Sequence, residues 1–246
     1  MVVKYNDLDT MIFKWEGLGK KGKIKMKEFV YVTEREAKKV KKELIELINL
    51  VQDEVRNQFT FRYDFIGSAS RNMITYDKNG NTGYDFDVNL RVNDDEEEYS
   101  AKEIKDILRA GFDKHVKRFK YDFTEDSSRV ITIKVKDTKN SKILHSCDFA
   151  IVYDCEDGRQ QYVRYNKNQS SYTWEYQPKG FYRLPERIEL IKENSLWNEL
   201  RDLYLENKNK NNNPKKKSRS IFAESVNQIV NSYELEDDLY EEDDYE

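Results

Sequence analysis

Cysteine and histidine are scarce in this chain of 246 residues, which has only two of each. A structural zinc site needs a set of closely spaced Cys and His ligands, and no such set can be assembled here. Cys147 and Cys155 are therefore expected to be reduced and structural. His115 and His145 have no triad-like partner within their own segments, which argues against a Ser-His type of catalysis.

Long apolar runs are also missing. No stretch approaches the roughly 20 apolar residues that a membrane helix needs, and the first ten residues lack the basic-then-apolar pattern of a signal peptide. The sequence therefore predicts a cytoplasmic protein with no membrane partner. Hydrophobic residues make up 37% and aromatic residues 13% of the chain, enough for a sizeable core, so it reads as a soluble globular protein.

The acidic residues are unevenly distributed along the chain. Residues 234–246 contain nine of the 47 acidic residues and no basic residue, while the rest of the chain has more basic than acidic residues. A block of like charges repels itself and is typical of a disordered tail. A mildly basic body is typical of proteins that handle phosphates.

The first half of the chain predicts a helix followed by two strands. Residues 33–58 begin with a capping-box spacing and then place apolar residues on one helical stripe. Residues 59–66 alternate at the period of a strand and end at Gly67-Ser68. Residues 84–92 alternate again, so Asp85 and Asp87 project from the same face of one strand.

The second half predicts a helix, three strands and a helical lobe. A second capping box precedes a helix over 100–119, and strands are expected at 129–136, 143–153 and 160–166. Helices are expected at about 186–206 and 219–233. The predicted fold class is α+β, with a small mixed β-sheet core flanked by helices. The predicted organisation is a catalytic core over 1–184, a helical C-terminal lobe over 185–233 and an acidic disordered tail over 234–246.

Asp148 lies in the second of those strands, where Ser146 and Ala150 share its face. Small neighbours leave room for a carboxylate to reach a ligand. With Asp85 and Asp87 it makes three convergent carboxylates, which are the oxygen ligands that Mg²⁺ or Mn²⁺ takes together with phosphate oxygens. Such ions neutralise a triphosphate and activate an attacking hydroxyl, so the pattern predicts nucleotidyl transfer from an NTP, with Asp148 as the general base.

The Gly67-Ser68 turn adds a second element to this pattern. Glycine permits close approach of the backbone, and the amides and hydroxyl at Ser68 are placed to hold the β- and γ-phosphates at the start of a short helix. The motifs FIGSASR (65–71), YDFDVNL (84–90) and CDFAIV (147–152) together resemble the DNA polymerase β-like nucleotidyltransferase superfamily. They look most like its bacterial branch, which is similar to oligoadenylate synthetases and the cGAS/DncV-like enzymes.

The resemblance covers roughly residues 33–206 and implies a small mixed sheet with flanking helices and a helical C-terminal lobe. It implies that Asp85, Asp87 and Asp148 are catalytic and hold the metal. It also implies nucleotide binding by the Gly67-Ser68 turn and Arg71, and a basic residue on the first C-terminal helix that contacts the triphosphate. Lys192 and Arg201 both fit that last role, and Lys192 is the residue assigned to it.

An aromatic and basic segment over 159–183 has two interpretations. Interleaved aromatic and basic side chains can stack on a nucleobase while they contact phosphate, which makes Tyr172 and Trp174 candidate nucleotide-binding residues. Equally, aromatic residues favour strands, and the second interpretation is a flap that covers the sheet.

Two other function classes remain open from the sequence. A glycosyltransferase could use the Asp85–Asp87 pair to bind a nucleotide-sugar through Mn²⁺, but it leaves Asp148 and the Gly67-Ser68 turn without a role. A catalytically silent scaffold could bind RNA or a protein. The acceptor of a nucleotidyltransferase is likewise open, with a nucleotide, RNA, a small molecule or a protein hydroxyl as alternatives.

Overall fold

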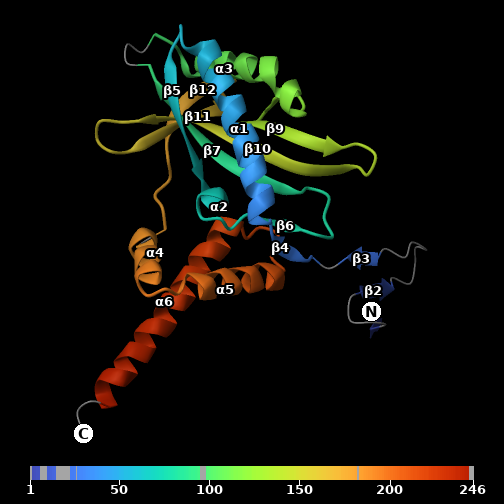
Figure 1. Cartoon of the computed structure of the whole chain (residues 1–246), viewed down its shortest axis with the longest axis vertical. Helices are drawn as coiled ribbons and strands as arrows, with labels where there is room; N and C mark the ends of the chain where they lie inside the picture. Colours follow the sequence, from blue (N-terminus) through green and yellow to red (C-terminus); the bar gives the residue numbers. More distant parts are fainter. Residues whose placement is uncertain are drawn as a thin grey trace.

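The computed structural model describes residues 2–5, 10–14, 23–25, 27–94, 98–181 and 183–243, with the backbone alone for the first three segments and for 235–243. Its centre is a seven-stranded mixed sheet with two helices against one face and a lobe of three helices below (Figure 1). The α+β class predicted from the sequence is confirmed. Among the described residues, no helix is both long and apolar enough to cross a membrane.

The main sheet is built from strands that are far apart in the sequence. Its order is β12-β11-β10-β7-β5, with β9 paired to β10 and β8 to β9. The strands are β5 (Thr60–Ile66), β7 (Tyr84–Asn93), β8 (Glu125–Asp126), β9 (Val130–Asp137), β10 (Lys142–Asp154), β11 (Gln160–Asn166) and β12 (Ser171–Tyr176). Only β7 and β10 are parallel, and every other pair is antiparallel. The parallel pair brings the two predicted acidic strands side by side.

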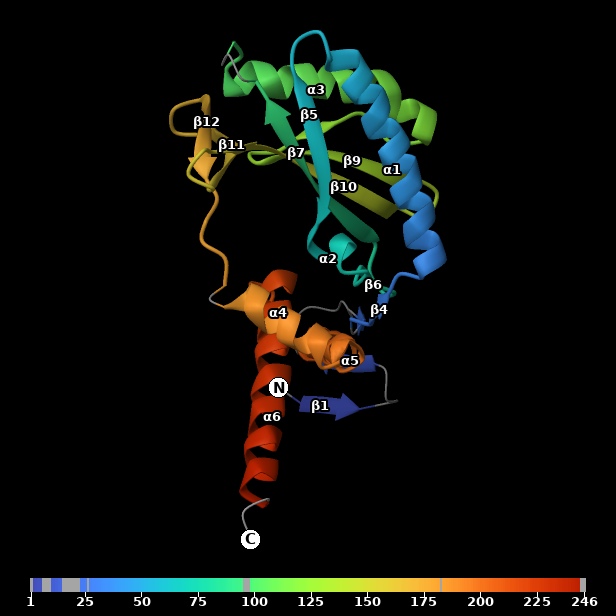
Figure 2. The same cartoon turned by 60° about the vertical axis from the view of Figure 1, so that its left-hand side comes forward.

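Helices α1 (Glu34–Val55) and α3 (Ala101–His115) cover one face of this sheet, as Figures 1 and 2 show from two sides. Both predicted caps are present: Thr33 accepts a hydrogen bond from the Glu36 amide, and Ser100 and Glu103 form a reciprocal capping box. The predicted apolar stripe of α1 is buried, and it consists of Val40, Leu44, Leu47, Ile48, Val51 and Val55. A 3-10 turn, η1 (Val116–Phe119), follows α3.

The remaining strands lie outside the main sheet. A two-stranded ribbon pairs β4 (Phe29–Tyr31) with β6 (Thr75–Asp77). The N-terminal segments β1 (Val2–Tyr5), β2 (Thr10–Lys14) and β3 (Lys23–Lys25) form a small antiparallel sheet. A single-turn helix, α2 (Gly67–Ser70), follows β5 where the sequence predicts a turn and a short helix.

The helical lobe contains three helices where two were expected. The predicted helix over 186–206 is interrupted, giving α4 (Leu184–Glu193) and α5 (Trp197–Lys210). Ser195 adopts a left-handed φ of +59°, and Asn194 turns its side-chain amide back to the Leu190 carbonyl, which ends α4. The break lets α4 and α5 both pack on α6 (Ser218–Asp243).

Helix α6 is longer than the sequence predicts. Its backbone continues past residue 233 to Asp243, through most of the segment assigned to a disordered acidic tail. Residues 244–246, and the side chains of the acidic segment from residue 235, lie outside the described residues.

Candidate metal centre

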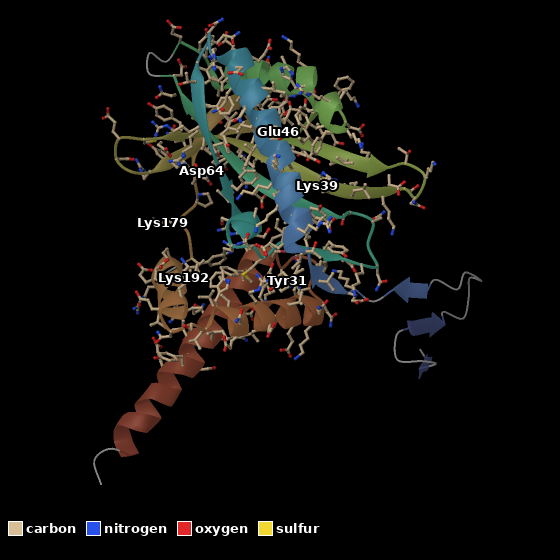
Figure 3. The ribbon with its side chains drawn as sticks, viewed as in Figure 1. Tyr31, Lys39, Glu46, Asp64, Lys179 and Lys192 are labelled. Atoms are coloured by element: carbon tan, nitrogen blue, oxygen red, sulfur yellow. The ribbon has the colours of Figure 1, made fainter. Side chains whose placement is uncertain are left out.

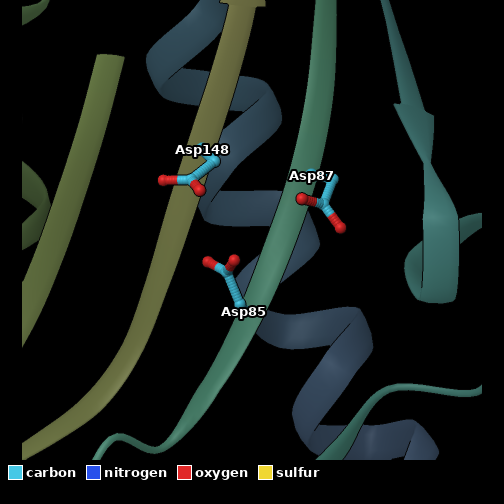
Figure 4. A group of neighbouring side chains, drawn as sticks. All are labelled: Asp85, Asp87 and Asp148. Atoms are coloured by element: carbon cyan, nitrogen blue, oxygen red, sulfur yellow. The ribbon is translucent and has the colours of Figure 1, made fainter. Parts of the chain in front are cut away.

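The three predicted aspartates come together because of the parallel pairing of β7 and β10. Along β7 the side chains alternate between buried and partly exposed, so Asp85 and Asp87 both project from the face opposite the helices. In the register of the pair, Asp148 lies beside Asp87, and Ser146 lies beside Asp85. One carboxylate oxygen from each aspartate lies within 4.8 Å of the others (Figure 4).

Two neighbouring hydroxyl groups hold two of the carboxylates. Ser146 Oγ donates a 2.7 Å hydrogen bond to Asp85 Oδ1. Thr132, the register partner of Asp148 on β9, donates a short hydrogen bond to Asp148 Oδ1. Ser146 could be expected beside Asp148 from strand parity, but Thr132 was missed because its position depends on the register between two strands.

All three carboxyl groups resist ionisation in this arrangement. Burial and the charge of Asp148 raise the pKa of Asp85 to about 7, although the Ser146 hydroxyl opposes the shift. Burial and Asp148 also raise the pKa of Asp87, which the Arg71 guanidinium partly offsets. Burial raises the pKa of Asp148, against the hydrogen bond from Thr132. Ionising all three carboxyl groups together is therefore unfavourable in the protein alone.

Gly67 is shaped by its contact with one of these carboxylates. Its φ is +62°, a conformation that L side chains rarely adopt, and a Cβ atom built there would lie 2.9 Å from Asp87 Oδ2. Glycine is therefore needed both for the turn and for the space that Asp87 occupies. The structure brings the Gly67-Ser68 turn to the aspartates, as the sequence predicts.

Arg71 is also brought to this region. It directly follows α2, its guanidinium lies 4.0 Å from the centre of the Phe222 ring, and Asp87 acts on it electrostatically. Its buried Nε has no hydrogen-bond acceptor among the described residues. A buried N–H without an acceptor is costly, so Arg71 has an unsatisfied donor in this region.

Tyr172 and Trp174, the candidate base-stacking residues, are not brought to the three aspartates. The registers from β10 through β11 to β12 place both side chains on the helix-covered face, opposite the aspartates. Both pack against the main hydrophobic core. The Tyr172 hydroxyl donates to Asp126, which also pairs with the buried Lys105 of α3. The flap interpretation of this segment is the one that fits.

The two basic candidates of the lobe are separated by the helix break. Lys192 is on α4 (Figure 3), half exposed and paired with Glu189 at 2.8 Å. Arg201 is on α5, where one of its nitrogens donates to the Asn72 carbonyl, next to Arg71. Neither contacts the three aspartates.

Comparison with known proteins supports the fold through structure alone. No family model matches the chain, and no curated protein matches its sequence. Vibrio cholerae DncV cyclic AMP-GMP synthase, solved with the linear intermediate 5′ pppA(3′,5′)pG, superposes with a TM-score of 0.51 at 10% identity, covering 72% of this chain and 60% of DncV. Its GTP-bound form gives 0.50 at 14% identity, over 80% of this chain and 52% of DncV.

The chain has the DncV nucleotidyltransferase fold. The structure of DncV with 3′-deoxy ATP agrees, with a TM-score of 0.50 at 14% identity. This chain spans about half to three fifths of the length of these DncV chains. The fold predicted from the three motifs is thus confirmed.

Within this nucleotidyltransferase fold, we expect Asp85→Asn to stabilise the metal-free protein. The pKa of Asp85 rises from 3.8 to about 7 on folding, so ionising it costs stability as the pH rises between these values. Removing that charge should raise the free energy of unfolding at pH 8 by about 1–3 kcal/mol. The difference should shrink towards pH 4, where the wild-type carboxyl is protonated in both states.

The measurement is thermal unfolding in EDTA from pH 4 to pH 8. We expect the melting temperature of the variant to exceed that of the wild type by roughly 3–8 °C at pH 8. Excess Mg²⁺ or Mn²⁺ should then favour the wild type and reduce the difference. An equal difference at every pH would contradict the charge-based account.

We also expect Tyr172→Phe to lower stability. The variant keeps the ring on the core and loses the hydrogen bond to Asp126. Its free energy of unfolding should fall by about 1–2 kcal/mol, as measured by chemical denaturation. An unchanged free energy of unfolding would contradict this structural role of the hydroxyl group.

Proposed function

We propose that this protein is a nucleotidyltransferase that uses Mg²⁺ or Mn²⁺ to transfer a nucleoside monophosphate from an NTP to a hydroxyl group, with release of pyrophosphate. The observation that carries this proposal is the convergence of Asp85, Asp87 and Asp148 within 4.8 Å on adjacent strands. The nucleotidyltransferase fold supports it independently.

The chemistry of the three aspartates fits a divalent cation. Burial raises the pKa of all three, and Asp148 adds repulsion at the other two. Carboxylate oxygens are the ligands that hard cations prefer, and a bound cation would offset the burial and repulsion that raise these pKa values. Asp85 and Asp87 would be shared ligands, and Asp148 would complete the set.

Each residue has a defined part in the transfer. The acceptor oxygen forms a bond to the α-phosphorus, and the bond from that phosphorus to the oxygen bridging to the β-phosphate breaks. The acceptor proton passes to Asp148, whose other carboxylate oxygen is held by Thr132. Bound divalent cations would supply charge neutralisation for the attacking and leaving oxygens.

The leaving pyrophosphate would lie against the turn after β5. Gly67 leaves room there for Asp87, Ser68 offers a hydroxyl and an amide, and Arg71 offers a guanidinium stacked on Phe222. An arginine suits this role because its fixed donors match phosphate oxygens and its charge persists at every working pH. Lys192, which lies on the lobe, stays in the proposal only as a candidate contact for the triphosphate.

The acceptor that we propose to test first is a nucleotide hydroxyl, with RNA second. One of the similar DncV structures holds a linear dinucleotide with a 5′ triphosphate, which is the product of transfer to a nucleotide hydroxyl. This chain has the same fold over 72% of its length.

The test is pyrophosphate release from each of the four NTPs, singly and in pairs, with Mg²⁺ or Mn²⁺, and with RNA added in a separate series. Mass spectrometry of the products identifies the acceptor and whether the product is linear or cyclic. Transfer from a nucleotide-sugar without pyrophosphate release would support the glycosyltransferase instead. Absence of NTP and metal binding would support the silent scaffold.

A further inference from the structure

The segment that follows α2 contacts the helical lobe as well as the main core, in which Ile74 is buried. Met73 is 1% exposed and belongs to the hydrophobic cluster of α4, α5 and α6. Arg201 donates to the Asn72 carbonyl at 2.6 Å, and Lys208 donates to the Thr75 hydroxyl. Tyr31, labelled in Figure 3, also packs against the lobe, and its hydroxyl donates to the Arg201 carbonyl. The lobe therefore fixes the position of the chain immediately after the Gly67-Ser68 turn.

Arg71 is the first residue of this segment, and a single aromatic ring of α6 lies against it. Phe222 is 3% exposed, and its ring centre is 4.0 Å from the Arg71 guanidinium carbon. Tyr204 of α5 packs edge-on against Phe222 at 5.9 Å and so fixes the ring in turn. The guanidinium is thus stacked on the lobe while its Nε has no acceptor among the described residues.

We infer that Phe222 is a positioning residue for triphosphate recognition: its ring holds the Arg71 guanidinium ready for the β- and γ-phosphates of the NTP. The inference rests on the proposed function, because the triphosphate is the ligand that Arg71 would meet. It extends that function by making the C-terminal lobe responsible for distinguishing a triphosphate from a monophosphate.

The ring is needed for electrostatic reasons as well as for packing. Burial removes water from the guanidinium, and the negative face of an aromatic ring partly replaces it. The carboxylate that acts most directly on Arg71 is that of Asp87. Without the ring, Arg71 would turn towards Asp87, where an ion pair would compete with the metal and withdraw the donor from the phosphates.

The experiment compares three variants of the full chain. Phe222→Leu keeps an apolar side chain and removes the ring, whereas Phe222→Tyr keeps the ring. Val226→Ala is the matched control, because Val226 is fully buried in the same cluster on the same helix, one turn further on. Binding of ATP, GTP, inorganic tripolyphosphate, AMP and GMP is measured by calorimetry with Mg²⁺, together with kcat, KM and the melting temperature.

For Phe222→Leu we expect NTP and tripolyphosphate affinity to fall about 5- to 10-fold, with KM raised and kcat little changed. Affinity for AMP and GMP should not change, because they lack the β- and γ-phosphates. Phe222→Tyr should restore triphosphate affinity to within about twofold of the wild type. Val226→Ala should lower the melting temperature at least as much as Phe222→Leu, yet leave triphosphate affinity unchanged.

Equal loss of triphosphate affinity in Phe222→Leu and Val226→Ala would overturn the inference, because it would reduce the ring to general packing. Wild-type affinity in Phe222→Leu would also overturn it and leave the proposed function intact. A wild-type protein that binds no triphosphate would overturn the proposed function and the inference with it.

Discussion

Asp87→Asn should reduce pyrophosphate release by a factor on the order of 10³ or more while the protein stays folded. Asp87 lies beside Asp148 in the strand register, against the Gly67 backbone and within the field of Arg71. An amide has the same shape but no charge, so the site loses a metal ligand without losing packing. The measurement is the initial rate of pyrophosphate release over a range of Mn²⁺ concentrations.

The folded state of this variant should be unaffected or more stable in EDTA, since a buried carboxylate with a raised pKa is removed. Asp64→Asn is the matched control. Asp64 lies on the same face of the sheet, opposite Asn89 in the register, but its carboxylate pairs with Arg91 at 2.6 Å. It should retain near wild-type turnover. If both variants lose activity alike, the effect belongs to the charge of the whole face and not to the three-aspartate site.

Gly83→Ala should give the largest loss of stability among single substitutions near the site, at least about 3 kcal/mol. Gly83 has a φ of +62°, and a Cβ atom there would lie 2.2 Å from the Leu144 carbonyl oxygen and 2.5 Å from that of Ile143. Both are backbone atoms of β10, so no side-chain rotation relieves the clash. The strand β7 begins at the next residue, and its start would have to move away from β10.

We expect the melting temperature of this variant to fall by roughly 6–12 °C, and its metal affinity to fall with it, because Asp85 would move relative to Ser146. Gly158→Ala is the control that separates backbone strain from a steric clash. Gly158 also has a positive φ, +77°, but no atom lies within 4 Å of the position of its Cβ. It should cost only about 1–2 kcal/mol. Similar losses in the two variants would show that backbone strain, and not the contact with β10, explains the effect.

The local parts of the fold and site could be predicted because their signals are carried by neighbouring residues. The stripe of α1, the helix caps at Thr33 and Ser100, and the alternation of β7 depend on spacings of two to four residues. The break between α4 and α5 could not be predicted from neighbouring residues in this way. Asn194 and Ser195 are tolerated in helices, and their role became visible only where both helices pack on α6.

The sequence by itself determined which carboxylates exist, that Asp85 and Asp87 share a face, and that a glycine turn precedes them, since strand alternation is a property of the chain alone. Tertiary structure decided the rest. The parallel register set Asp148 beside Asp87, the order of β10, β11 and β12 turned Tyr172 and Trp174 to the opposite face, and the lobe placed Phe222 against Arg71. Register and strand order follow from how the whole chain buries its apolar surface, so no short segment encodes them.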